Sequence, residues 1–282
     1  MRLTPGNDYR PRSTGPDDLK DVRRRMGDSL KARLTWFAGH EPATRALQTG
    51  SLTYTDCGLP SDVMNVVWGV PDSPADVKMV SRHYAVRRFP ATWWLPTDES
   101  AMAAWWLAAD GWIIRDLLIG MAFKPGENLK KRFELPDGLT VRPCLTPERV
   151  RDLGLVQGSV FMKDRPREGG IIYNAYEQCA EAIIEGDGGY RAWVAYAGET
   201  PVSSVVMIRR GRHFGMYDLT THPDYRHLDY AQATFLYALD EIWSSGGELV
   251  TLQAAAKGVD IYSRLGFSPV TQFVLWTNLA GL

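Results

Sequence analysis

Residues 190–222, YRAWVAYAGETPVSSVVMIRRGRHFGMYDLTTH, contain three apolar segments separated by two short turns. The first turn contains GETP and the second contains RRGRH, with Gly211 at its bend. Segments of this kind joined by tight turns predict three successive strands in an antiparallel meander. The third segment runs directly into a helical stretch, so later strands must join through crossover helices. The sequence therefore predicts an α/β fold, with a mixed, mostly antiparallel sheet flanked by helices.

The two halves of the chain end in the same pattern. Residues 91–122 and residues 248–277 each predict a strand, a polar loop, a helix and another strand. Each helix stops at a glycine followed by an aromatic residue, Gly111-Trp112 and Gly266-Phe267, and glycine suits the left-handed position after a helix. Generic helix-to-strand chemistry would also produce this pattern, but we favour a duplication.

A polar segment with proline and glycine, FKPGENLKKRFELPDGLTVRP (123–143), separates the two halves. We expect a disordered N-terminus at residues 1–17, a first domain at 18–125, a linker at 126–138 and a second domain at 139–282. Apolar periodicity predicts helices over residues 18–37 and 173–186, and Gly186 is the expected stop of the second helix.

Composition and charge exclude several classes of protein. The formal net charge of −1 gives no reason to expect nucleic acid or an anionic membrane as a partner. No apolar run approaches the roughly 20 residues that span a bilayer, and the N-terminus lacks the apolar core of a secretory signal. Cys57, Cys144 and Cys179 form no CxxC pair, which argues against a metal site and for a reducing compartment. We therefore expect a cytoplasmic protein that binds no metal.

Residues 221–235, THPDYRHLDYAQATF, predict the end of a strand, a tight polar turn and the start of a helix. Successive backbone N–H groups at a helix N-terminus carry partial positive charge and bind phosphate well. A strand that ends beside such a turn leaves backbone groups with which an extended, amide-rich ligand can pair. This turn is suited to a phosphate ligand, and a carboxylate at Asp229 is an unexpected residue in its middle.

Residues 190–276 resemble the GNAT superfamily of acyl-CoA-dependent N-acyltransferases. The turn pattern of that family is Arg or Gln, two residues, Gly, one residue, and Gly or Ala. Here it is matched by Arg226, by Asp229 in place of the glycine, and by Ala231. The segment LQAAAKGVDIYSRLGF (252–267) is similar to the family's later strand, loop and helix. The resemblance implies two tandem GNAT-like units, of which the first is degenerate and has Leu107 where the second has Tyr262.

The resemblance also implies roles for individual residues. Tyr262 would protonate the departing thiolate and Asp218 would help to deprotonate the amine. Tyr217 and Gln253 would contact the acceptor. The backbone of the strand would align the pantetheine arm and the turn amides would hold the pyrophosphate: Leu219, Thr220 and Thr221 for the arm, and Arg226, His227, Leu228, Asp229, Tyr230 and Ala231 for the pyrophosphate.

Some of these residues also have a structural interpretation. For Asp218, a structural role as a solvent-facing or hydrogen-bonded strand residue has equal weight. Gln253 could form hydrogen bonds with the neighbouring backbone. His213 and His222 flank the strand and are expected at the surface.

Asp229 has two interpretations. Aspartate tolerates left-handed backbone geometry and can cap a helix, so it could replace the glycine without harm. A carboxylate directed into the turn would instead repel pyrophosphate. Two unit charges about 4 Å apart repel by about 1 kcal/mol in water and about 4 kcal/mol at an effective dielectric of 20. We favour retained binding, because the rest of the turn and YSRLGF match the family.

We therefore expect an N-acyltransferase that moves an acetyl or other acyl group from acyl-CoA to an amine of a small molecule or peptide. The amine would attack directly in a ternary complex. One alternative is a non-catalytic GNAT-like protein whose CoA site Asp229 has disabled and which binds a ligand through an aromatic-rich cleft. Another is an acyltransferase whose donor is a carrier protein. The sequence leaves the acceptor and the oligomeric state open.

Overall fold

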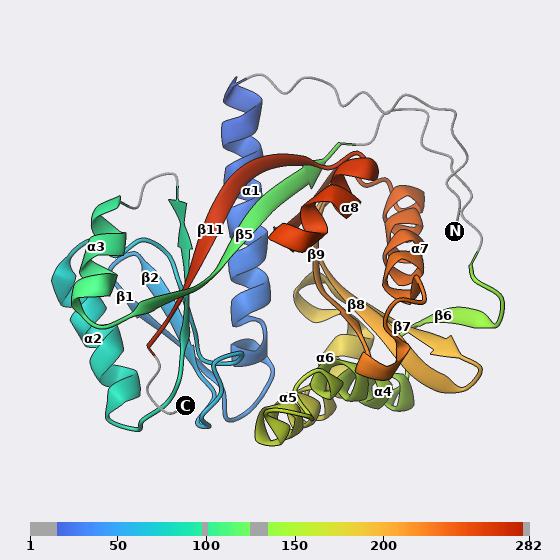
Figure 1. Ribbon diagram of the computed structural model, residues 1–282, viewed down its shortest axis with the longest axis horizontal. Helices are drawn as coiled ribbons and strands as arrows, with labels where there is room; N and C mark the ends of the chain where they lie inside the picture. Colours follow the sequence, from blue (N-terminus) through green and yellow to red (C-terminus); the bar gives the residue numbers. More distant parts are fainter. Residues whose placement is uncertain (1–15, 98–100, 125–134, 279–282) are drawn as a thin grey trace. The chain divides into compact units, whose positions relative to one another are not determined.

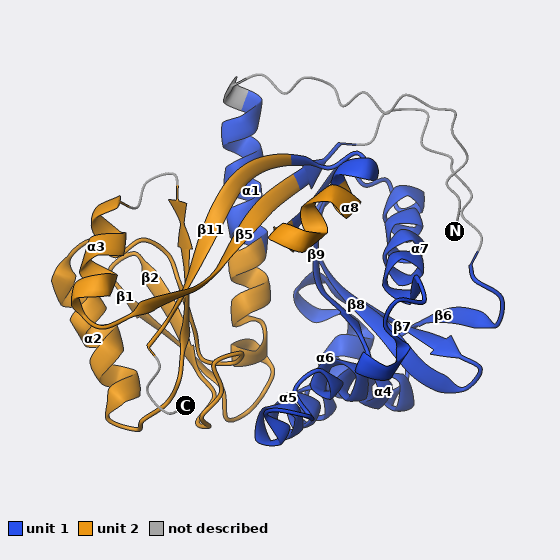
Figure 2. Cartoon of the chain, viewed as in Figure 1, with its two compact units in different colours: residues 1–29, 122–252, 263–268 blue, residues 30–121, 253–262, 269–282 orange. Residues whose placement is uncertain are grey.

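The computed structural model describes residues 16–97, 101–124 and 135–278. The chain forms two compact units, each assembled from separate stretches of sequence (Figure 2). Unit 1 comprises residues 1–29, 122–252 and 263–268, and unit 2 comprises residues 30–121, 253–262 and 269–282. Residues 1–15 of the expected disordered N-terminus and residues 126–134 of the expected linker lie outside the described residues.

Unit 1 is built on the predicted meander. Its strands follow the order β10-β9-β8-β7-β6 (Figure 1). The pairs β6–β7, β7–β8 and β8–β9 are antiparallel, while β9 and β10 are parallel because α7 connects them as a crossover helix. The strands are β6 (Leu139–Pro143), β7 (Tyr190–Ala197), β8 (Thr200–Arg210), β9 (His213–Thr221) and β10 (Leu249–Ala255).

Helices cover both faces of these strands. Figure 1 shows α7 on one face and the group α4 to α6 toward the other, and both α4 and α7 pack on β8. The helices are α4 (Pro147–Ser159), α5 (Pro166–Gln178), α6 (Ala180–Glu185) and α7 (Tyr230–Ser244). As a result β8 is buried without interruption from Val202 to Ile208. Glycines let α4 and α5 approach closely, because a Cβ on Gly158 would lie 2.7 Å from the carbonyl oxygen of Gly169.

The predicted helix over residues 173–186 differs in detail from the observed one. It begins earlier, at Pro166, and breaks into α5 and α6 at Cys179. Gly186 ends α6 in the left-handed conformation, as predicted, with φ at 76°. The predicted helix over residues 18–37 is α1 (Pro16–Thr35).

Unit 2 has the strand order β1-β2-β3-β4-β11-β5. Its strands are β1 (Arg45–Thr49), β2 (Leu52–Asp56), β3 (Val66–Trp68), β4 (Thr92–Pro96), β5 (Ile113–Phe123) and β11 (Ser268–Thr277). Helices α2 (Pro74–Ala85) and α3 (Ala101–Ala109) contact each other. A boundary between the two units in the sequence falls within α8 (Val259–Arg264), after Tyr262. The core of this unit contains Trp93, Trp112, Tyr84 and Leu107 at 2% exposure or less.

The two halves contain the same order of elements. In β3-α2-β4-α3-β5 and in β9-α7-β10-α8-β11, the first two strands are parallel. The glycines that end the matching helices, Gly111 and Gly266, have φ angles of 88° and 93°. The aromatic residues after them, Trp112 and Phe267, are both buried. The predicted α/β fold with two matching halves is confirmed.

The last strand of the chain lies inside unit 2. Residues 273–277 of β11 pair antiparallel with residues 92–96 of β4. β11 therefore occupies the position between β4 and β5, although β5 follows β4 in the chain. Unit 2 is completed by a strand from the far end of the sequence.

Within the described ranges, no helix combines the length and apolar character needed to cross a bilayer.

Candidate functional site

Strand β9 bulges at Asp218, the predicted general base. The register with β8 shifts between Ser204, which faces Thr220, and Val206, which faces Tyr217, so two residues of β9 oppose one of β8. Asp218 itself has a left-handed backbone with φ at 50°. A bulge of this kind bends a strand and redirects its side chains and backbone groups. The predicted pantetheine-aligning residues, Leu219 to Thr221, follow directly after the bend.

Gln157 of α4 holds the bulge in place. Its side-chain amide donates to the backbone carbonyl of Asp218 at 2.7 Å and to Ser204 Oγ at 3.0 Å. Its carbonyl oxygen accepts from Thr220 Oγ1 at 3.0 Å. Sequence analysis missed Gln157, although a signal exists: it is a polar residue on the buried side of a helix, in register with Val150 and Leu153.

On the same strand, the hydroxyl of Tyr217 donates to Ser29 Oγ of α1 at 2.8 Å, and its side chain is buried. Gly215 leaves the space for this bond, because a Cβ there would lie 2.2 Å from Tyr217 Oη and 2.4 Å from Ser29 Oγ. The contact of Tyr217 with an acceptor stays a prediction.

At the start of β9, His213 is buried, so the expectation of a surface histidine was wrong. Its Nε2 lies 2.9 Å from Thr251 Oγ1. Burial, reinforced by the positive charges of Arg25 and Arg210, lowers the pKa of His213 to about 4. His213 is therefore neutral at physiological pH.

The turn after β9 leads into α7. A short helix at Pro223–Tyr225 is followed by exposed residues from Arg226 to Asp229. His227 and Asp229 are both left-handed, with φ angles of 65° and 60°. Asp229 thus adopts a conformation that glycine takes readily, as one of its two interpretations requires. Its side chain makes no capping hydrogen bond to α7 within the described part of the chain, so it replaces the conformation of glycine without adding a cap.

Tyr262 and Gln253 belong to unit 2, on α8 and β10. Burial raises the pKa of the Tyr262 phenol to about 12, so the hydroxyl keeps its proton at neutral pH. Gln253 Nε2 is buried and has no hydrogen-bond partner among the described residues. A buried amide donor without a partner costs about 1–3 kcal/mol, so a ligand acceptor there would be favourable.

Leu107, at the matching place in the first half, is fully buried in the core of unit 2 and offers no proton donor. The turn in that half, between β3 and α2, has Pro71 and Asp72 before the N-cap Ser73, and Asp76 lies in the first turn of α2. Asp72 accepts from the backbone N–H of Ser51 at 3.0 Å. That the first unit is a degenerate copy stays a prediction.

Comparisons with known proteins agree with this architecture. Residues 169–274 match the family model described as the acetyltransferase (GNAT) domain. A comparison with curated protein sequences finds no significant match. Residues 169–274 therefore form a GNAT acetyltransferase domain, and the resemblance predicted from the turn and from IYSRLGF is confirmed for that region.

Solved structures match over most of the chain. A GCN5-related N-acetyltransferase from Kribbella flavida has a TM-score of 0.64 at 19% identity, covering 91% of this chain and 95% of that one. A tandem GNAT protein from the clavulanic acid biosynthesis pathway has a TM-score of 0.56 at 14% identity, covering 96% and 90%. A GCN5-related N-acetyltransferase from Sphaerobacter thermophilus has a TM-score of 0.54 at 13% identity, covering 83% and 75%. At these identities the likeness shows the fold, which is that of GNAT proteins, a tandem one among them.

Proposed function

We propose that the chain is an acyl-CoA-dependent N-acyltransferase, of the EC 2.3.1 class, that transfers an acetyl or other acyl group to an amine of a small molecule or peptide. The observation that carries this proposal is the continuous path in unit 1 from the bulge at Asp218 to the first turn of α7. Along this path, Asp229 has a left-handed backbone conformation, which the glycine of the family turn pattern would adopt readily at the same position.

The backbone of the turn is suited to binding a pyrophosphate, but one side chain, that of Asp229, weakens this binding. The first N–H groups of α7 lack acceptors within the helix and carry the positive end of its dipole. Asp229 is exposed to solvent, so the repulsion appropriate to it is the water value of about 1 kcal/mol at 4 Å, rather than about 4 kcal/mol. A penalty of that size lowers affinity about fivefold, which supports retained binding.

The chemistry requires two proton transfers. When bound, the thioester supplies an activated acyl group. A new N–C bond forms as the C–S bond breaks, so the amine loses a proton and the leaving sulfur gains one. Asp218 would accept the amine proton, directly or through water, and Tyr262 would donate to the sulfur. A phenol pKa of about 12 keeps Tyr262 protonated and ready for that role.

The remaining predicted residues bind rather than react. Backbone groups of Leu219 to Thr221 would pair with the amides of the pantetheine arm, as an added strand would. The amides of residues 226–231 would hold the pyrophosphate. Gln253, whose buried amide has no partner in the described residues, would donate to the acceptor or to the acyl carbonyl.

The experiment that tests the proposal is calorimetric titration of acetyl-CoA into the wild type, Asp229→Gly and Asp229→Asn. We expect saturable binding by the wild type, and several-fold tighter binding by both variants because each removes the carboxylate. Asp224→Asn is the matched control, since it removes an exposed carboxylate outside residues 226–231 and should change affinity less.

Two results would contradict the proposal. The first is that neither the wild type nor the variants bind acetyl-CoA. The second is that only Asp229→Gly binds, which would show that Asp229 has disabled the site in the natural chain and that the protein is a non-catalytic relative.

A further inference from the structure

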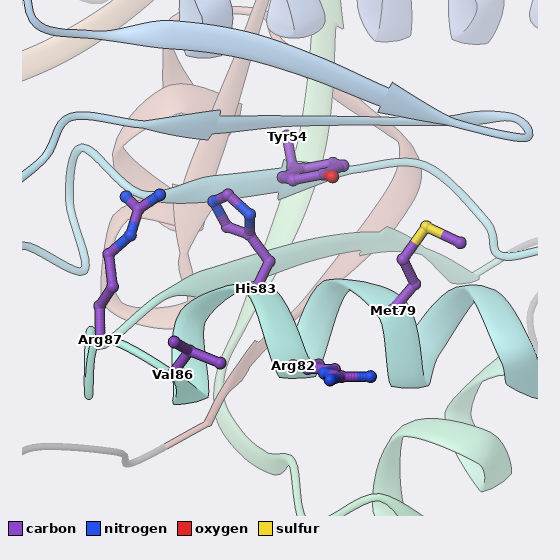
Figure 3. Close-up of a pocket in the computed structure, with 6 residues that line it drawn as sticks. All are labelled: Tyr54, Met79, Arg82, His83, Val86 and Arg87. Carbon is purple, nitrogen blue, oxygen red and sulfur yellow. The ribbon is translucent and has the colours of Figure 1, made fainter.

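Unit 2 contains a hollow along one face of α2 (Figure 3). Its volume is about 350 Å³, within the range of sites that hold small organic ligands. Three of its lining residues, Met79, Arg82 and His83, are spaced three and four apart on α2 and share one side of the helix, and Val86 and Arg87 follow directly after the helix ends. The lining consists of Tyr54 from β2 and Met79, Arg82, His83, Val86 and Arg87 from α2 and its end.

A buried carboxylate positions two of these residues. Asp56 ends β2 and is 5% exposed. Its oxygens accept from the N–H of Gly58 at 2.9 Å, lie 2.8 Å from His83 Nε2 and form an ion pair with Arg87. Burial alone would raise the pKa of Asp56, but these hydrogen bonds and the Arg87 charge outweigh it and the pKa is lowered. Asp56 is therefore an anion that holds His83 and Arg87 in fixed positions.

The charges of the hollow do not cancel. Arg87 compensates Asp56 yet keeps nearly half of its side chain exposed. Arg82 has no ion-pair partner among the described residues. The lining thus carries a net positive charge, with histidine between the two arginines in the sequence of the helix.

The rest of the lining is apolar. Met79 on α2 and Val86 at its C-cap are 53% and 77% exposed, which is high for apolar side chains. The ring of Tyr54 stands edge-on to His83, with ring centroids 5.3 Å apart. A ligand that matches this lining needs both an anionic group and an apolar body.

We propose that this hollow binds a small organic carboxylate, with its charged group on Arg82 and Arg87 and its apolar part against Tyr54, Met79 and Val86. Guanidinium groups bind carboxylates in a planar, two-pronged geometry, and one already fixed by Asp56 loses little freedom on binding. An inorganic anion would leave the apolar lining uncovered, and a cation would meet the uncompensated Arg82. The site belongs to the unit without a CoA-type turn, so the proposal does not depend on acyl transfer.

Methionine methyl NMR tests this proposal directly. The full chain labelled with ¹³C at its methionine methyl groups is titrated with sodium phenylacetate as the probe. We expect a saturable shift of the Met79 methyl resonance, while Met162, which is equally exposed on unit 1, does not move. Phenylacetamide, which has the same shape without the charge, should bind at least tenfold more weakly.

Arg82→Gln is the decisive variant, because Arg82 is exposed and its loss should leave the fold intact. We expect phenylacetate affinity to fall about tenfold, with unchanged shifts for the buried Met26 and Met64 methyls. Arg88→Gln, an exposed neighbour outside the lining, is the matched control and should bind like the wild type. The proposal is overturned if Met79 does not shift saturably, if phenylacetamide or inorganic phosphate binds as well as phenylacetate, or if Arg82→Gln binds like the wild type.

Discussion

The side-chain amide of Gln157 donates a 2.7 Å hydrogen bond to the backbone carbonyl of Asp218, the left-handed residue at the bulge of β9. A non-glycine residue in this conformation costs about 1–2 kcal/mol, so it persists only where its surroundings fix it. Gln157 supplies that constraint, together with its bonds to Ser204 and Thr220. It acts as a positioning residue for the strand that is proposed to align the acyl donor.

Replacing Gln157 by alanine should therefore weaken donor binding more than it slows the chemical step. Three polar groups around the bulge lose their partner, at a cost of about 1–3 kcal/mol. We expect KM for the acyl donor to rise about tenfold, with kcat changed by less than threefold. Steady-state kinetics with varied donor concentration measures both. Gln178→Ala, at the exposed end of α5, is the control and should leave both constants unchanged.

Tyr262→Phe should slow the reaction by about 10²–10⁴-fold in kcat, the range for loss of a general acid, with little change in KM. The wild-type phenol has a pKa of about 12, so its loss of a proton should not limit the rate anywhere between pH 6 and pH 10. Pre-steady-state and steady-state kinetics of the wild type and of Tyr262→Phe measure this difference. Tyr225→Phe, in the short helix before the turn, serves as control. If Tyr262→Phe has a normal kcat, a group other than Tyr262 protonates the leaving sulfur.

The buried His213 should make the protein less stable in mild acid. Its ordinary pKa of 6.5 falls to about 4 in the folded chain, so below pH 6.5 the unfolded chain binds a proton that the folded chain does not. Stability should decline as the pH falls from about 6.5 to about 4, by about 3 kcal/mol in all. Urea unfolding at pH 7 and at pH 4.5 measures this. His213→Gln should show a shallower decline over that interval, and an equally steep one would rule out His213 as the cause.

Gly215→Ala should destabilise unit 1 without changing any charged or reacting group. The added Cβ would meet Tyr217 Oη at 2.2 Å and Ser29 Oγ at 2.4 Å, and overpacking of this kind costs about 1–3 kcal/mol. We expect the melting temperature to fall by several degrees in calorimetry. Adding Tyr217→Phe removes one of the clashing atoms and should recover part of the loss. If the double variant is no more stable than Gly215→Ala, the clash with Tyr217 Oη is not the source of the strain.

Local sequence patterns were enough to predict the meander of β7 to β9, the parallel return through α7, and the two helices that end at Gly111 and Gly266. Each depends on residues close together in the chain: apolar alternation, a turn glycine, or a helix stop. The family resemblance came from the same kind of signal, in the turn around Asp229 and in IYSRLGF.

Features that depend on distant residues were missed. The bond between Gln157 and Asp218 joins residues that lie 61 positions apart, and the surface assignment of His213 failed because burial is decided by what packs over a strand. The hollow beside Asp56 requires α2 to be placed against β2. The hairpin of β1 and β2 was predictable in principle, since Gly50 precedes an alternating segment, LTYTD.

The position of β11 between β4 and β5 affects the order in which the sheet assembles during synthesis. Synthesis proceeds from the N-terminus, so β4 and β5 leave the ribosome long before their middle neighbour exists. Until residues 273–277 emerge, β4 has an open edge where its final partner belongs, and open edges invite pairing with other chains. The sheet is therefore most open to pairing with other chains while only the first half has been made, and it closes only once residues 273–277 have been made.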